Sequence, residues 1–169
     1  IITSQQGKGR FLREIPISQL GEDKQEEMSK NLERYSLYEA YEVRQVLETK
    51  AMDLIVRNAT DSDLDEVETA YQTMLLRFAE TNTTTGEFEL HQLYAKKTGS
   101  VFMEQTLNIV LSTILEMMHT TSHNVMDMHQ VEEEKADHRR MIDALHKRDS
   151  SAAQQAMYDH IQHTLDILQ

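Results

Sequence analysis

The stretch DHRRMIDALHKRDSSAAQQAMYDHI, residues 137–161, contains two helical patterns joined by a short polar turn. On both sides of the turn, the positions that face a core recur at offsets 0, 3, 4 and 7, the spacing of a helix with one buried face. Asp149 and Ser150 lie in the turn and can cap the second helix. Similar patterns fill most of the remaining chain, so the sequence predicts an all-α fold.

The composition supports an antiparallel helical bundle. The chain has 169 residues, the size of one ordinary domain, and contains only five glycines and one proline. A β-sandwich or barrel needs a turn roughly every 8–12 residues, which this composition does not supply. Short connections favour six or seven antiparallel helices, at about residues 22–33, 37–59, 60–79, 87–98, 101–118, 131–147 and 151–168. Residues 120–130 fit either a loop or a continued helix.

The charge and residue usage exclude several classes of function. With 17 basic and 29 acidic residues the net charge is −12, which repels phosphate backbones, so nucleic acid is not expected across the main surface. The absence of cysteine excludes disulfides, thiolate zinc sites and cysteine nucleophiles. No apolar run is long enough to cross a membrane and no signal peptide is recognisable, so we expect a cytoplasmic location without membrane contact.

The first residues differ in character from the rest of the chain. Residues 1–16, IITSQQGKGRFLREIP, are the one segment with strand and turn signals. Gly7-Lys8-Gly9 fits the turn of a hairpin, and Pro16 fits its boundary. The alternative is a loose terminal arm. Because the chain begins at Ile1 and not at Met, we expect a fragment that lacks something upstream.

A histidine stands inside the apolar stripe of three expected helices: His91, His138 and His160. Glu87 lies one turn before His91 on the same face. Buried polar groups need partners, and one divalent ion would satisfy all four side chains at once. Neutral imidazole and carboxylate suit Zn, Ni, Mn, Co or Fe(II), and such an ion could also bind a small carboxylate. The spacing alone leaves an alternative open, in which each histidine is hydrogen-bonded to a neighbour in the core.

Other polar clusters are interpreted as structural. We interpret the acidic run at residues 132–134 as a solvated helix face, and His146 and His163 as exposed because they fall off the stripes. The pair His119 and His123 has no carboxylate on its face, which favours a solvated helix end. A Met-rich stretch is interpreted as core packing, at positions 117, 118, 126 and 128.

Several segments share a pattern with a known family. They are residues 41–48 (YEVRQVLE), 87–91 (EFELH), 137–145 (DHRRMIDAL), 148–153 (RDSSAA) and 157–161 (MYDHI). Together they resemble the FCD ligand-binding domain of the FadR-type branch of the GntR bacterial transcription regulators. Residues 4–12 resemble the wing hairpin that ends the winged-helix DNA-binding domain of that family. The resemblance thus implies a wing remnant and linker at residues 1–16 and an FCD domain at residues 17–169.

The resemblance implies a dimeric, all-helical effector domain with a metal site. In metal-binding members, an Asp and three His hold a divalent ion beneath the effector pocket. The matching positions here are Glu87, His91, His138 and His160, so the usual Asp is replaced by a side chain one methylene longer. We expect one divalent transition metal per chain, Zn before Ni, Mn, Co or Fe.

The resemblance also implies partners and effector contacts. Arg44 matches the arginine that faces the pocket and could hold an effector carboxylate bidentately; its alternative role is a surface salt bridge with Glu48. Ser100 stands where the family commonly has Asn after Thr-Gly, and is the second expected effector contact. The expected partners are a small organic or sugar acid, a second copy of the chain, and operator DNA reached only through the missing N-terminal winged-helix domain.

The residues are compatible with three functions. The leading one is a metabolite sensor in a transcription regulator. The second is a metal-dependent enzyme, either a hydrolase or a di-iron protein. Di-iron bundles use Glu-x-x-His at i,i+3, whereas the pair here is at i,i+4, and no general base is evident beside the four candidates. The third is a purely structural dimerisation bundle. The sequence therefore predicts a sensor domain and not an enzyme.

Overall fold

The computed structural model describes residues 2–5, 9–12, 22–81, 85–121 and 128–168, and the side chains of residues 35–80, 86–118 and 132–168. The chain divides into two compact units, Ile1–Tyr35 and Ser36–Gln169. The elements are β1 (Ile2–Gln5), β2 (Gly9–Leu12), α1 (Glu22–Asn58), α2 (Asp61–Thr81), α3 (Thr85–Lys97), α4 (Val101–Thr121), α5 (Met128–His146) and α6 (Ser150–Leu168).

The first unit contains the hairpin that the sequence predicts. Strands β1 and β2 pair antiparallel, with Ile2 opposite Leu12 and Gln5 opposite Gly9. The expected turn at Gly7 and Lys8 lies outside the described residues, as does Pro16.

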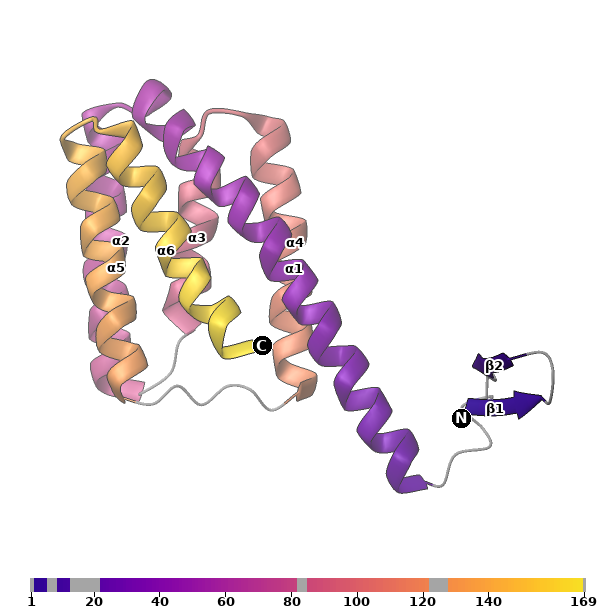
Figure 1. The fold of residues 1–169 in the computed structure, drawn as a ribbon. Coiled ribbons are helices and arrows are strands. Elements are labelled where there is room, and N and C mark those ends of the chain that lie inside the picture. The colour runs from indigo at the N-terminus through magenta and orange to yellow at the C-terminus, as the bar shows by residue number, and fades with distance from the viewer. Residues whose placement is uncertain (1, 6–8, 13–21, 82–84, 122–127, 169) are drawn as a thin grey trace. The chain divides into compact units, whose positions relative to one another are not determined.

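The second unit is the predicted all-α antiparallel bundle. In the part of the chain that the structure describes there are six α-helices, and successive helices run in alternating directions (Figure 1). Helix α3 packs between α2 and α4, and α5 packs against both α2 and α6. Gln45 of α1 donates to the Tyr158 carbonyl and the Gln162 side chain of α6, both at 3.1 Å, so α1 and α6 also lie side by side.

One predicted helix boundary is wrong. The sequence pattern predicts separate helices at residues 22–33 and 37–59, but α1 runs without interruption from Glu22 to Asn58. The reason is that this stretch contains neither Gly nor Pro, so nothing in it ends a helix. Helix α4 continues to Thr121 and α5 begins at Met128, so both ends of the ambiguous segment are helical.

Three helix ends carry local caps, and the cap predicted at Asp149 is confirmed. The Thr60 hydroxyl accepts the Asp63 backbone N–H at 3.2 Å, and the Asp63 carboxylate accepts the Thr60 N–H at 2.9 Å, a reciprocal capping box at the start of α2. The Asp149 carboxylate accepts the Ala152 N–H at 3.0 Å at the start of α6. Gly99 ends α3 with a left-handed φ of 68°, which favours glycine.

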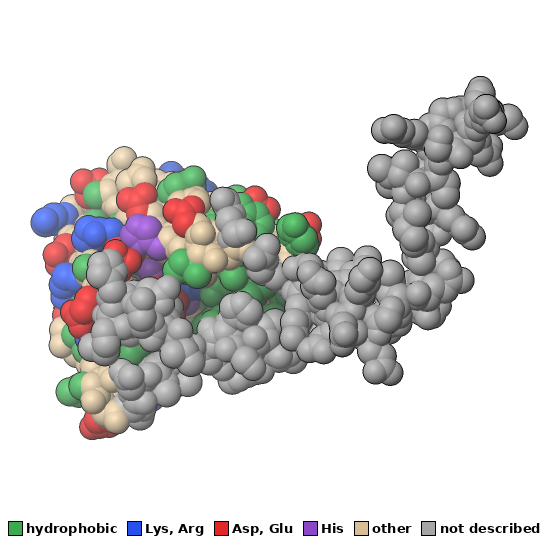
Figure 2. Space-filling view, turned by 60° about the horizontal axis from the view of Figure 1, so that its bottom comes forward, with side chains coloured by type: hydrophobic (Ala, Val, Ile, Leu, Met, Phe, Trp, Pro, Cys, Tyr) green, Lys and Arg blue, Asp and Glu red, His purple; other side chains and the backbone are tan. Residues whose placement is uncertain are grey.

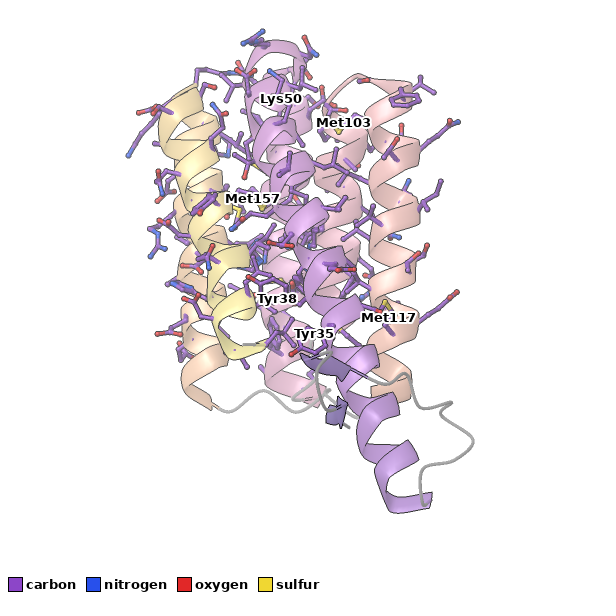
Figure 3. All side chains as sticks on the ribbon, turned by 45° about the vertical axis from the view of Figure 1, so that its right-hand side comes forward. Tyr35, Tyr38, Lys50, Met103, Met117 and Met157 are labelled. Carbon is purple, nitrogen blue, oxygen red and sulfur yellow. The ribbon has the colours of Figure 1, made fainter. Side chains whose placement is uncertain are left out.

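The described core of the bundle is apolar except for one polar cluster and two buried polar side chains outside it, Asp53 and Thr98. Met157 of α6, labelled in Figure 3, is fully buried. The expected core roles of Met117 and Met118 are confirmed, since both are half-buried against the core. Embedded in this core are eight buried polar or charged side chains from α1, α3, α5 and α6: Arg44, Glu48, Glu87, His91, Glu134, Asp137, His138 and His160. None of the described helices is both long and apolar enough to span a bilayer.

Candidate metal centre

Three imidazoles and one carboxylate converge inside the bundle. His91 and Glu87 lie on α3, His138 on α5 and His160 on α6, and each offers a ligand atom within 4.8 Å of the others. The ring centroids of the histidines are 4.7–5.2 Å apart. The structure therefore brings together all four side chains that the apolar stripes singled out.

The spacing of the donor atoms suits a single ion. Nε2 of His91 lies 3.2 Å from Nε2 of His160, and Oε1 of Glu87 lies 3.6 Å and 3.7 Å from these two atoms. Donor atoms bound to one zinc at about 2.0–2.2 Å in a tetrahedral site are separated by roughly 3.3–3.6 Å. The three donors thus stand at nearly the separation that shared coordination requires.

Glycine and arginine at two special positions bring the helices together. A Cβ on Gly86 would lie 3.2 Å from Met74 Cγ and 3.3 Å from Met74 Cα, so glycine allows the first turn of α3 to approach α2 closely. Arg148 follows α5 with a left-handed φ of 55°, a conformation that costs a non-glycine residue energy. Its guanidinium donates to the Ala59 carbonyl at 2.7 Å and pairs with Asp61 at 2.6 Å, which offsets that cost and ties the α5–α6 turn to the end of α1.

A second layer of polar groups faces the outer nitrogen of each histidine. Nδ1 of His91 contacts the carboxylate of Glu48. Nδ1 of His138 lies 3.4 Å from the Tyr94 hydroxyl. Nδ1 of His160 lies 3.5 Å from Oε2 of Glu134 and 3.6 Å from Oδ2 of Asp137. Such outer partners orient metal-binding histidines and fix their tautomers.

Arg44 is part of this second layer and not a surface residue. Its guanidinium is 1% exposed, and Nε donates to Oε1 of Glu48 at 2.6 Å. Nη2 lies 3.5 Å from Oε1 of Glu87. The guanidinium also lies over the rings of Tyr41 and Phe88, at 5.3 Å and 5.4 Å from their centroids. The predicted salt bridge with Glu48 therefore exists, but it is buried beside the four converging side chains.

Two buried carboxylates were missed at the sequence level. The interpretation of residues 132–134 as a solvated face is wrong for Glu134, which is 8% exposed and lies 4.0 Å from Nε2 of His138. Glu134 precedes His138 by four residues, the same spacing as Glu87 and His91, and that repetition could have revealed it. Asp137 is also buried, and it pairs with His163 at 3.1 Å, so this exposed histidine has a partner in the core.

Burial and neighbouring charges shift the pKa values of the buried histidines and of Glu134. Burial lowers the pKa of His91 and of His138 well below the usual range, which keeps both imidazoles in the neutral, metal-binding form. Burial opposes protonation of His160, but the Glu134, Asp137 and Glu87 carboxylates together raise its pKa to about 10. Burial and the Glu87 charge raise the pKa of Glu134 to about 8.

The buried groups around the three histidines are suited to a metal ion. In the described part of the chain, the Arg44 guanidinium and the protonated His160 lie beside four buried acidic side chains: Glu48, Glu87, Glu134 and Asp137. Nε2 of His138 is buried with no hydrogen-bond partner among the described residues. An unpaired imidazole nitrogen and the convergence of four donor side chains both fit a divalent cation, so this cluster could hold one.

The remaining candidates lie apart from the cluster or outside the described side chains. The Ser100 hydroxyl accepts the Met103 N–H at 3.3 Å and so caps α4; its effector role stays a prediction. His146 is exposed, as expected. The side chains of His119 and His123 lie outside the described residues.

Comparison with known proteins agrees with the fold and the sequence pattern. Residues 39–163 match the family of FCD domains. The HTH-type transcriptional regulator LutR of Bacillus subtilis (strain 168) is 22% identical over 173 residues, which cover 99% of this chain and 77% of that protein.

Two solved structures share the fold. Streptococcus agalactiae GntR has a TM-score of 0.65 at 18% identity, over 98% of this chain and 74% of that one. E. coli McbR/YncC has a TM-score of 0.65 at 13% identity, over 99% of this chain and 72% of that one. At these identities the likeness concerns the fold alone.

Removal of the buried guanidinium should destabilise the metal-free protein strongly. Arg44→Gln leaves Glu48 and Glu87 buried without their cation, and breaking a buried ion pair in this way costs about 3–5 kcal/mol. Arg57→Gln is the matched control, because Arg57 also pairs with a carboxylate four residues away on α1 but is 63% exposed. We expect a much smaller loss there. Urea unfolding with chelator present measures both, and equal losses would contradict the buried-pair argument.

Proposed function

The chain belongs to the FCD family and is the FCD domain of a GntR-family transcriptional regulator, not an enzyme; on this premise we propose that it senses a small organic or sugar acid at a divalent-metal site. The ligands of the metal would be Glu87, His91, His138 and His160. The wing remnant and linker would occupy residues 1–16, and the FCD domain residues 17–169.

The observation that carries this proposal is the convergence of these four side chains in the core of the bundle. Imidazole and carboxylate donors without thiolate suit Zn, Ni, Mn, Co or Fe(II), and we propose one such ion per chain, with Zn first. Bound there, the ion would supply a fixed positive charge that attracts an oxygen ligand. Such a centre favours an anionic, oxygen-rich small molecule.

Arg44 and Ser100 are the proposed effector contacts from the protein itself. Arg44 already donates through Nε to Glu48, and Nη2 lies near Glu87, so Nη1 and the second Nη2 hydrogen are the donors that an effector carboxylate could use. Oε1 of Glu87 lies within 3.7 Å of Nη2 of Arg44 and of Nε2 of His91 and His160, so an ion held by these ligands would lie close to the guanidinium. A carboxylate with a neighbouring hydroxyl, as organic and sugar acids have, could contact both.

We propose that the regulator acts as a homodimer. Along α4 the outward positions include Phe102 and Ile109, which are 81% and 66% exposed. The only Asp, Glu, Lys or Arg residues in α4 are Glu104 and Glu116. Phe102 and Ile109 are two turns apart on one face of α4, and this pair, called here the apolar stripe of α4, supports contact with a second copy.

Operator DNA would be reached through an N-terminal winged-helix domain. On the face shown in Figure 2, Lys and Arg side chains lie among Asp and Glu side chains, and the net charge of the whole chain is −12. Such a surface is unsuited to a phosphate backbone. Effector binding would influence DNA only if the acid has different affinities for two dimer geometries.

Metal binding is the first test of this function. Protein purified without chelators or a nickel column should contain about one divalent ion per chain, by elemental analysis. The substitutions His138→Ala and His160→Ala should each abolish stoichiometric binding, because each removes an inward donor. His146→Ala is the matched control, since His146 is exposed on the same helix as His138 and should leave the metal content unchanged. Retention of the full metal content in both core variants would contradict the ligand assignment.

Acid binding should depend on the metal. A panel of small organic and sugar acids, tested by thermal shift, should include members that raise the melting temperature of the metal-loaded protein. The same acids should have no effect after treatment with a chelator, because the ion supplies the main attraction for the carboxylate. The corresponding amides and alcohols are the controls. Equal shifts with and without metal would contradict the proposed docking of the acid at the ion.

The apolar stripe of α4 should be required for dimerisation. The double substitution Phe102→Glu and Ile109→Glu places two charges in the proposed interface, so the protein should become monomeric in light scattering. Leu76→Glu is the control, because Leu76 is 65% exposed on α2, away from that stripe. A wild-type monomer, or a double variant that is still dimeric, would overturn the proposal.

A further inference from the structure

Arg44, Glu48 and His91 form a buried chain of contacts between two helices. Glu48 is 1% exposed and uses both of its carboxylate oxygens: Oε1 accepts from Nε of Arg44 at 2.6 Å, and Oε2 contacts Nδ1 of His91. Arg44 and Glu48 are one turn apart on α1, whereas His91 lies on α3. Glu48 therefore connects the proposed effector-binding arginine, Arg44, to a proposed metal ligand, His91.

We propose that Glu48 is a positioning residue that fixes His91 in the tautomer whose Nε2 is free to bind metal. The inference rests on the proposed metal site. An ionised carboxylate only accepts hydrogen bonds, so the proton of His91 must reside on Nδ1, the atom that faces Glu48. Nε2 then presents its lone pair toward Glu87 and His160, which lie 3.6 Å and 3.2 Å away. The same proton on Nε2 would prevent coordination.

Glu48 is not placed to be a ligand itself. Its Oε2 contacts the outer nitrogen of the His91 ring, opposite the nitrogen that faces the centre. Its Oε1 is held by Arg44. The outer contacts of the other two histidines are longer, at 3.4 Å for His138 and 3.5–3.6 Å for His160. His91 thus has the closest outer partner of the three, and its tautomer is the most strongly set from outside.

Arg44 makes a neutral substitution at Glu48 unusually informative. In Glu48→Gln, Nε of Arg44 still donates, so the amide oxygen must face Arg44 and the amide NH₂ must face His91. The amide would then donate to Nδ1 and move the histidine proton to Nε2. Glu48→Gln, which hardly changes the shape of the side chain, should therefore move the His91 proton from Nδ1 to Nε2. His91 could then no longer bind a metal through Nε2.

The first experiment measures Zn²⁺ affinity of the full chain by competition with a chromophoric chelator. We expect Glu48→Gln to bind Zn²⁺ about 10–100-fold more weakly than wild type, the range typical of lost outer-layer partners. Asp53→Asn is the matched control: Asp53 is another buried α1 carboxylate that pairs with an arginine four residues away, but its partners are Arg57, Lys50 and Ser150. It should bind Zn²⁺ as wild type does.

The second experiment reads the tautomer directly, by ¹⁵N NMR of the histidine rings in metal-free protein. In wild type the ring proton of His91 should be on Nδ1, and in Glu48→Gln it should be on Nε2. A general loss of stability would not move this proton. If Glu48→Gln does not fold, the wild-type spectrum alone decides: a proton on Nε2 of His91 overturns the inference.

A double-substitution cycle separates this role from a structural one. In a His91→Ala background, Glu48→Gln should cause no further loss of Zn²⁺ affinity, because Glu48 acts through His91. Equal Zn²⁺ binding by wild type and Glu48→Gln would refute the role of Glu48 while the metal site stands. Failure of wild type to bind any divalent metal would contradict the proposed function, and this inference with it.

Discussion

The constraint on which this structure depends is the burial of four carboxylates and one guanidinium around three imidazoles in an otherwise apolar bundle. Each of these charges loses hydration on folding, and in a medium of low polarity the loss is recovered only through close partners. Arg44 compensates part of the negative charge through Glu48 and Glu87. His160 compensates another part, since the surrounding carboxylates raise its pKa to about 10. The arrangement of α1, α3, α5 and α6 is the one that lets these groups meet.

The cluster contains more polar residues than the four candidate ligands, because a second set of residues surrounds those ligands. Inner atoms face one point, and outer atoms hold the inner ones in orientation. Glu48 does this for His91, and Glu134 and Asp137 lie beside His160. The turn pinned by Arg148 and the close approach at Gly86 fix the helices on which these residues sit. The positions of the four inner side chains are therefore fixed by residues that do not themselves face the centre.

The sequence reveals the inner layer of this site far better than the outer one. His91, His138 and His160 stand out because a histidine in an apolar stripe is anomalous, and helical spacing then brings Glu87 to the same face. Glu134 does not stand out, because it ends a run of three glutamates in an acidic chain, where a solvated face is the ordinary interpretation. The caps at Thr60, Asp149 and Gly99 were predictable from local chemistry. The continuity of α1 was also predictable, because residues 22–58 contain neither Gly nor Pro and polar composition alone does not end a helix.

The distance along the chain between the converging residues has a further consequence. His91 and His160 are 69 residues apart in sequence, yet their Nε2 atoms lie 3.2 Å apart. An ion shared by these two atoms would close a long loop, as a disulfide does, in a chain that has no cysteine. Unlike a disulfide, this crosslink would vanish when the chain unfolds, so its contribution would grow with the concentration of free metal and not with the oxidising power of the surroundings.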